Sequence, residues 1–139
     1  MSYATVIAGL HTRYATVGGI KAVLDYEPKT ISNPPVLYSL LDSVTRTQEG
    51  QVTVMRYRIL SRLCIRWQDN ERAEEELQPF VNALPSAVDL DPKLGGAIPS
   101  GIARVTDIQA VFVTINGVFY RCLDTYCEVV EKAPWRTGI

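Results

Sequence analysis

The stretch from Val52 to Trp67 alternates between two kinds of side chain, and this alternation constrains the fold more than any other feature of the chain. Its odd positions are mostly apolar: Met55, Tyr57, Ile59, Leu63, Ile65 and Trp67. Its even positions carry arginines: Arg56, Arg58, Arg62 and Arg66. Because successive side chains of a β-strand point to opposite faces, the pattern predicts one long strand with an apolar face and an arginine-bearing face.

A hairpin is predicted near the C-terminus, where 102–115 and 118–131 flank the turn signal Asn116-Gly117. Pairing about this turn places one apolar set on one face: Val111, Val113, Ile115, Val118, Tyr120 and Cys122. The opposite face carries a second apolar set: Ile108, Phe112, Phe119 and Leu123. Both faces of such a sheet need cover, and we expect helices on one face and another element, or a second copy of the chain, on the other.

Helical spacing appears in two places. A stripe at the N-terminus predicts an amphipathic helix that ends at Gly18-Gly19: Tyr3, Val6, Ile7, Leu10, Tyr14 and Val17. Asp69 or Asn70 is expected to cap a second helix, whose first turns carry Glu71, Glu74 and Glu75 near the positive end of the helix dipole. Pro79 is expected to kink or split this helix, and Pro85 to start a separate short segment.

These elements predict a single α+β domain over residues 1–131, with helices packed on one face of a mostly antiparallel sheet. A further strand is expected over Val36–Val44, followed by a long hairpin loop over Thr45–Gln51. Residues 132–139 are expected to form a C-terminal tail. We expect this loop and tail to be mobile in a free subunit and ordered by partners, with Arg46 and Trp135 as docking anchors.

The composition excludes several classes of protein. A net charge of -1 provides no general attraction to nucleic acid or to an anionic membrane. No apolar run approaches the roughly 20 residues of a membrane span, and the N-terminus does not have the pattern of a signal peptide. Three cysteines do not make a secreted disulfide framework, so a reducing compartment is expected.

The cysteines and the single histidine give weak signals for chemistry. Cys122 and Cys127 are an odd number of residues apart on one predicted strand, so they face opposite sides and are expected to serve as buried packing. His11 would have to serve any Ser-His-Asp or Cys-His arrangement, but no nucleophile elbow or cysteine-protease signature accompanies it. We therefore expect no enzymatic activity, no bound metal and no cofactor.

The arginine face has three possible roles. It is either the solvent-facing side of a sheet, a partner for an acidic face of a neighbouring subunit, or a lining close to nucleic acid.

Four features in this order resemble the tail terminator family of long-tailed bacteriophages, small proteins of the type that caps the lambda tail tube. They are "YEP" from Tyr26, the acidic-to-apolar helix from Asp69, "LGG" from Leu94, and the closing hairpin with "NGVFY". The resemblance spans roughly residues 1–131. It implies an α/β fold in which helices pack on a mostly antiparallel sheet.

The resemblance also implies a homohexameric ring that ends polymerisation of the tail tube and forms the head-tail joining surface. The implied partners are the tail tube protein and a head-completion or connector protein, with genomic DNA possible in the lumen. The implied location is the virion, after assembly in the host cytoplasm. In such a ring we expect the arginine strand to pair with Glu71, Glu74 and Glu75 of a neighbouring subunit in preference to DNA. The alternatives are another neck, tail-completion or head-closure protein, or a small-ligand-binding cytosolic domain.

Overall fold

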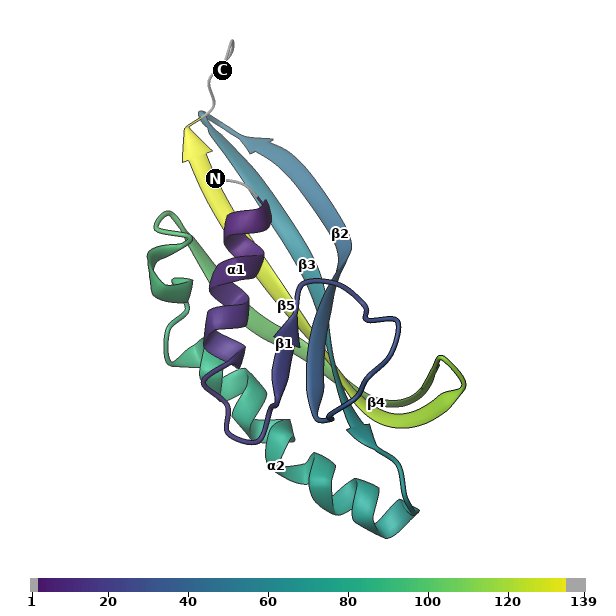
Figure 1. The fold of residues 1–139 in the computed structure, drawn as a ribbon. Helices are drawn as coiled ribbons and strands as arrows, with labels where there is room; N and C mark the ends of the chain where they lie inside the picture. The colour runs from purple at the N-terminus through teal and green to yellow at the C-terminus, as the bar shows by residue number, and fades with distance from the viewer. Residues whose placement is uncertain (1–2, 135–139) are drawn as a thin grey trace.

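The arginine-bearing strand is the central strand of a five-stranded sheet, and two helices cover one face of this sheet (Figure 1). The computed structural model describes residues 3–134. The elements along the chain are α1 (Tyr3–Tyr14), β1 (Ala22–Leu24), β2 (Val36–Glu49), β3 (Val52–Arg66), α2 (Asn70–Asp89), the 3-10 helix η1 (Leu94–Gly96), β4 (Gly101–Ile115) and β5 (Val118–Pro134). The strand order is β1-β2-β3-β5-β4, with β1 parallel to β2 and all other neighbours antiparallel. The structure therefore confirms the expected fold class, a single α+β domain with a mostly antiparallel sheet.

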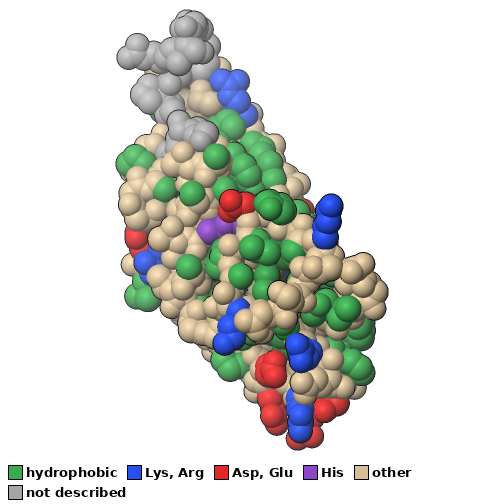
Figure 2. Space-filling model, viewed as in Figure 1, with side chains coloured by type: hydrophobic (Ala, Val, Ile, Leu, Met, Phe, Trp, Pro, Cys, Tyr) green, Lys and Arg blue, Asp and Glu red, His purple; other side chains and the backbone are tan. Residues whose placement is uncertain are grey.

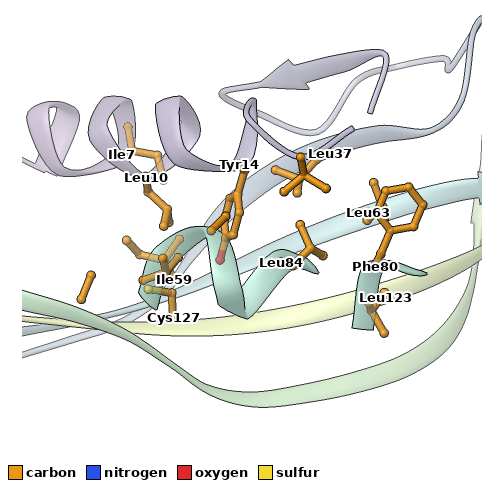
Figure 3. Packing of buried hydrophobic residues seen from close by; sticks show 14 of the residues in the cluster. Ile7, Leu10, Tyr14, Leu37, Ile59, Leu63, Phe80, Leu84, Leu123 and Cys127 are labelled. Atoms are coloured by element: carbon orange, nitrogen blue, oxygen red, sulfur yellow. The ribbon is translucent and has the colours of Figure 1, made fainter. Parts of the chain in front are cut away.

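The main core lies between the helices and the odd-numbered face of β3, as the alternation predicts. Ile59, Leu63 and Ile65 are fully buried there. Figure 3 shows Ile59 and Leu63 lying among Leu10 and Tyr14 of α1 and Leu84 of α2. The predicted cap of α2 is also confirmed, because the backbone N–H of Arg72 donates to the Asp69 carboxylate at 2.9 Å.

The split expected as one outcome at Pro79 and the separate segment expected from Pro85 are both wrong, since one helix runs from Asn70 to Asp89. A kink at Pro79, the other expected outcome, is compatible with this continuous helix. Each proline leaves the carbonyl four residues earlier without its helical donor, and these carbonyls belong to Glu75 and Val81. Both of these residues are exposed, so water can hydrate the freed carbonyls. The buried stripe continues past both prolines to Val88, and its packing holds the helix together.

The predicted hairpin loop over Thr45–Gln51 is also wrong. β2 continues to Glu49, and only Gly50 and Gln51 lie between the strands. A bulge between Leu41 and Ser43 shifts the alternation of β2 by one residue, which hides the strand pattern in the sequence. At the other end of the chain, β5 pairs with β3 as far as Pro134, so 132–134 are strand residues within the segment predicted as a tail. Trp135 lies outside the described residues.

The predicted faces of the C-terminal hairpin are confirmed by its register, which pairs Val113 with Tyr120 and Phe112 with Arg121. On the face away from the helices, a second apolar core is formed by Tyr38, Cys64, Ile115, Tyr120 and Cys122. Leu24 and Ile31 pack against this core, and the Tyr120 hydroxyl donates to the Ile31 carbonyl at 3.2 Å. The segment between β1 and β2 therefore supplies part of the second cover from within the same chain.

Candidate functional site

His11 lies between a carboxylate and a serine in the order of a hydrolytic triad. Its Nδ1 is 3.0 Å from the Asp25 carboxylate, and its Nε2 is 2.7 Å from the Ser39 hydroxyl. Ser39 Oγ is in turn 2.8 Å from Ser61 Oγ. The sequence draws attention to His11 alone, because its partners come from the end of β1, from β2 and from β3.

The burial of this network is the reverse of what serine hydrolysis requires. A nucleophilic serine must be reachable by substrate, and its aspartate is normally buried. Here Ser39 is 3% exposed, whereas the side chain of Asp25 is 76% exposed. The network instead provides hydrogen-bond partners for the buried side chains of His11, Ser39 and Ser61, where α1 packs on the sheet.

Burial lowers the pKa of His11 below its usual value, although hydrogen bonding and the charge of Asp25 act in the opposite direction. The imidazole is therefore neutral near pH 7. In this state Nδ1–H donates a hydrogen bond to the Asp25 carboxylate, and Nε2 accepts a hydrogen bond from the Ser39 hydroxyl.

The arginine face contains one buried ion pair. Arg62 Nε and Nη2 donate to the two oxygens of Asp124 at 2.7 and 2.8 Å. Asp124 is 3% exposed, and the hydrogen bond to it raises the pKa of Arg62 above its usual value. This bidentate pair lies beside Tyr38, whose hydroxyl is 3.5 Å from Arg62 Nη1.

The other three arginines are more open. Arg58 pairs with Asp42 at 3.0 Å and lies 4.3 Å above the ring of Tyr126. Arg56 makes a long contact of 3.4 Å with Thr47 Oγ1. Arg66 is exposed at the end of β3 and lines a shallow surface pocket with Asn33, Pro34, Gln68 and Glu76.

The acidic start of α2 lies on the opposite side of the sheet from the arginine face. Figure 2 shows charged side chains gathered at this end of the molecule. Glu71 and Glu75 are exposed, and Glu74 accepts from Arg121 Nε at 2.8 Å. Among residues 3–134, no recorded ion pair joins these glutamates to the four arginines of β3.

An aromatic patch lies beside this acidic end. The sequence placed Phe112 and Phe119 on one face of the hairpin, but it did not predict that Trp67 joins them. The rings of Phe112 and Phe119 are stacked with centroids 5.0 Å apart, and Trp67 meets Phe119 edge-on at 5.5 Å. Arg121 covers Phe112 at 4.3 Å. The three aromatic residues belong to three different strands or strand ends, so only the sheet register brings them together.

Both edges of the sheet are open within the described part of the chain. β1 pairs only with Val36–Tyr38, so the outer side of β2 has no neighbouring strand from Ser39 to Glu49. Three apolar side chains are exposed along this free part: Leu40, Leu41 and Val44. At the other edge, β4 pairs only with β5 and exposes Ile102 and Phe112. Such edges present rows of backbone donors and acceptors to a further strand.

Arg46 lies on the free part of β2 and lines a shallow pocket with Thr47, Gln48 and Thr53 near the β2–β3 turn. Within residues 3–134, no helix is both long and apolar enough to cross a membrane. The same residues contain no group of three or more histidine, cysteine or acidic side chains placed to hold a metal ion. Comparison of the chain with models of known protein families and with curated proteins found no match.

Proposed function

We propose that this protein is a structural subunit of a bacteriophage neck, a tail terminator that forms a homohexameric ring at the head-proximal end of the tail tube. The observation that carries the proposal is a sheet with two long open edges, formed by different strands. A subunit of this kind can add to its own copies at both edges.

The strand directions support a head-to-tail junction. Along the sheet, β2, β3, β5 and β4 alternate in direction. When β4 of one copy lies beside β2 of the next, the two strands are therefore antiparallel and the helices of both copies lie on the same side. A junction between two different patches closes into a ring when the rotation between copies allows it, and closure removes both edges.

The proposed partners are the tail tube protein on one side of the ring and a head-completion or connector protein on the other. Arg46, close to the β2–β3 turn, and Trp135 are the proposed docking residues. The proposed location is the virion, after assembly in the host cytoplasm. The role is structural and not enzymatic, in keeping with the buried Ser39 and exposed Asp25.

Native mass spectrometry combined with cryo-electron microscopy of the particle tests this proposal. Leu41→Lys with Val44→Lys places charges along the free part of β2 and should abolish the six-subunit species, because edge lysines oppose strand addition. Leu90→Lys is the matched control, since Leu90 is 80% exposed at the end of α2. A monomer or a two-fold dimer at the neck overturns the proposal. A ring found elsewhere in the neck would favour another tail-completion or head-closure protein.

A small-ligand or hydrolytic domain is the second candidate, because Ser39, His11 and Asp25 are correctly ordered for serine chemistry. A fluorophosphonate probe distinguishes the two functions. We expect no labelling of the folded protein at Ser39. Labelling that disappears in Ser39→Ala and persists in Ser61→Ala would favour the hydrolase.

A further inference from the structure

The second core contains a pair of thiols that meet across two strands. Cys64 of β3 and Cys122 of β5 are direct cross-strand partners in the register of the sheet. Their sulfur atoms are 3.1 Å apart, and both residues are fully buried. Cys127 faces the other side of the sheet, within the main core, so it is separated from this pair by the sheet itself.

The geometry of this pair suits a covalent bond. Directly opposed residues on antiparallel strands have Cβ atoms about 4.5–5.5 Å apart, and a disulfide needs about 3.5–4.5 Å. The two sulfurs are only about 1 Å farther apart than in a disulfide, whose S–S bond is about 2.05 Å. A small rotation of the two side chains can close this gap without changing the strand register.

We propose that Cys64 and Cys122 form an oxidisable dithiol, which a low-molecular-weight disulfide such as oxidised glutathione converts into an intramolecular disulfide between β3 and β5. The bond would close a loop that contains α2 and β4. This modification strengthens the second core under oxidising conditions, and it does not depend on the proposed function.

The reaction balances in two exchange steps. One protein thiolate attacks a sulfur of oxidised glutathione, which forms a mixed disulfide and releases one glutathione thiolate. The second protein thiolate attacks the protein sulfur of that mixed disulfide, forms the Cys64–Cys122 bond and releases the second glutathione thiolate. Two electrons pass from the protein to oxidised glutathione, and the two thiol protons end on the two released glutathione molecules.

Burial makes the dithiol slow to react in the folded protein. The contact with Cys64 and burial both raise the pKa of the Cys122 thiol. The reactive thiolate is therefore scarce while the second core is closed. Leu24 and Ile31 pack over that core, so we expect opening of this cover to limit the rate.

The test is equilibration of the full chain in a buffer of reduced and oxidised glutathione, followed by intact-mass measurement and peptide mapping. Two starting points are used: the folded reduced protein, and reduced protein refolded in the same buffer, for which access to the sulfurs is not limiting. We expect a mass lower by two hydrogens, a single Cys64–Cys122 link and a free Cys127. The unfolding temperature should rise by roughly 5–15 °C, since the bond restricts the unfolded chain.

Cys127→Ala is the matched control and should lose the same two hydrogens. Cys64→Ser should lose none and show no rise in unfolding temperature with oxidised glutathione. Three free thiols at equilibrium from both starting points, or a link that includes Cys127, overturn the proposal. The mapping of the unaltered chain decides the matter even if a variant fails to fold.

Discussion

Arg62 and Arg58 lie on the same face of β3, but the loss of their partners should have different effects. Asp124→Ala leaves the half-buried Arg62 without its carboxylate and should lower the free energy of unfolding by about 3–5 kcal/mol. Asp42→Ala removes an exposed partner of Arg58 and should cost about 0–1 kcal/mol. Urea unfolding of both variants measures the difference. Equal losses would show that burial does not distinguish the two ion pairs.

His11 should make the protein sensitive to mild acid. Its pKa in the folded state is lowered, so the neutral imidazole favours the folded protein above the unfolded pKa of about 6.5. This contribution is progressively lost as the pH falls below about 6.5 toward the lower pKa of the folded state. The urea midpoint should therefore fall more between pH 7.5 and 5 in the parent chain than in His11→Gln. Identical pH profiles for the two proteins would contradict this account.

At the residue scale, the sequence predicted the face of a side chain better than its partner. The odd separation of Cys122 and Cys127 placed them on opposite faces correctly. The Cys64–Cys122 contact was not predicted, because it depends on β3 lying next to β5 in one particular register. The partners of His11 were missed for the same reason, since Asp25 and Ser39 are distant from it in sequence.

The sequence predicted the elements whose side-chain pattern is regular or whose turn has a specific signal. It did not predict the full length of β2, which contains a bulge, or of α2, which contains internal prolines. β3 has no bulge, so its side chains alternate between the two faces in an unbroken register. The turn Asn116-Gly117 closes the β4–β5 hairpin with positive φ angles of 50° and 77°. β2 loses its period at the bulge after Leu41, so its second half was taken for a loop. α2 was predicted to kink or split at Pro79 and to give way to a separate segment at Pro85, because local propensity does not include the packing that carries one helix past both prolines.

Gly9 should be needed where α1 meets η1. A Cβ at this position would lie 2.7 Å from the Ala97 Cβ and 3.0 Å from the Leu94 carbonyl oxygen. Gly9→Ala should therefore destabilise the protein by about 1–3 kcal/mol, despite the better helix propensity of alanine. Gly18→Ala is the control, because no neighbouring atom lies within 4 Å of its Cβ position. Thermal unfolding compares the two, and a stabilised Gly9→Ala would contradict the close contact.

The free part of β2 should show strand-like hydrogen exchange in the unassembled protein. One side of β2 pairs with β3, and the other is open from Ser39 to Glu49. Amides in this range should therefore alternate between slow and fast exchange, and the fast ones should become slow when copies assemble. Exchange measured residue by residue by NMR tests this expectation. Uniformly fast exchange over 45–49 would instead support the mobile loop predicted from the sequence.

At the scale of the whole molecule, the fold class followed from the sequence but the strand order did not. Alternation in the strands and apolar stripes in the helices predict the elements and their buried faces. This information is enough to predict a fold in which helices pack on one face of a sheet. The insertion of β5 between β3 and β4, and the parallel pairing of the short β1, depend on long-range register. The open edges that support ring assembly follow from this order, so they could not be inferred from the elements alone.

Charge reversal on the arginine face separates contact with a neighbouring subunit from contact with DNA. Reversing Arg58 or Arg62 would disturb ion pairs within the chain, so Arg56→Glu with Arg66→Glu is the cleaner change. Pairing of these arginines with Glu71 and Glu75 of a neighbouring subunit needs a contact beyond the β2–β4 junction, because that junction keeps the helices of both copies on the side away from the arginine face. With such a contact, the double variant should weaken ring assembly, and Glu71→Arg with Glu75→Arg should restore it in part. The parent ring should also dissociate more readily at higher salt, since salt screens exposed ion pairs. Native mass spectrometry at two salt concentrations measures all three effects, and Lys29→Glu, an exposed charge in the segment between β1 and β2, is the control. An intact ring that loses its hold on DNA in the Arg56 and Arg66 variant would show that the arginines line the lumen.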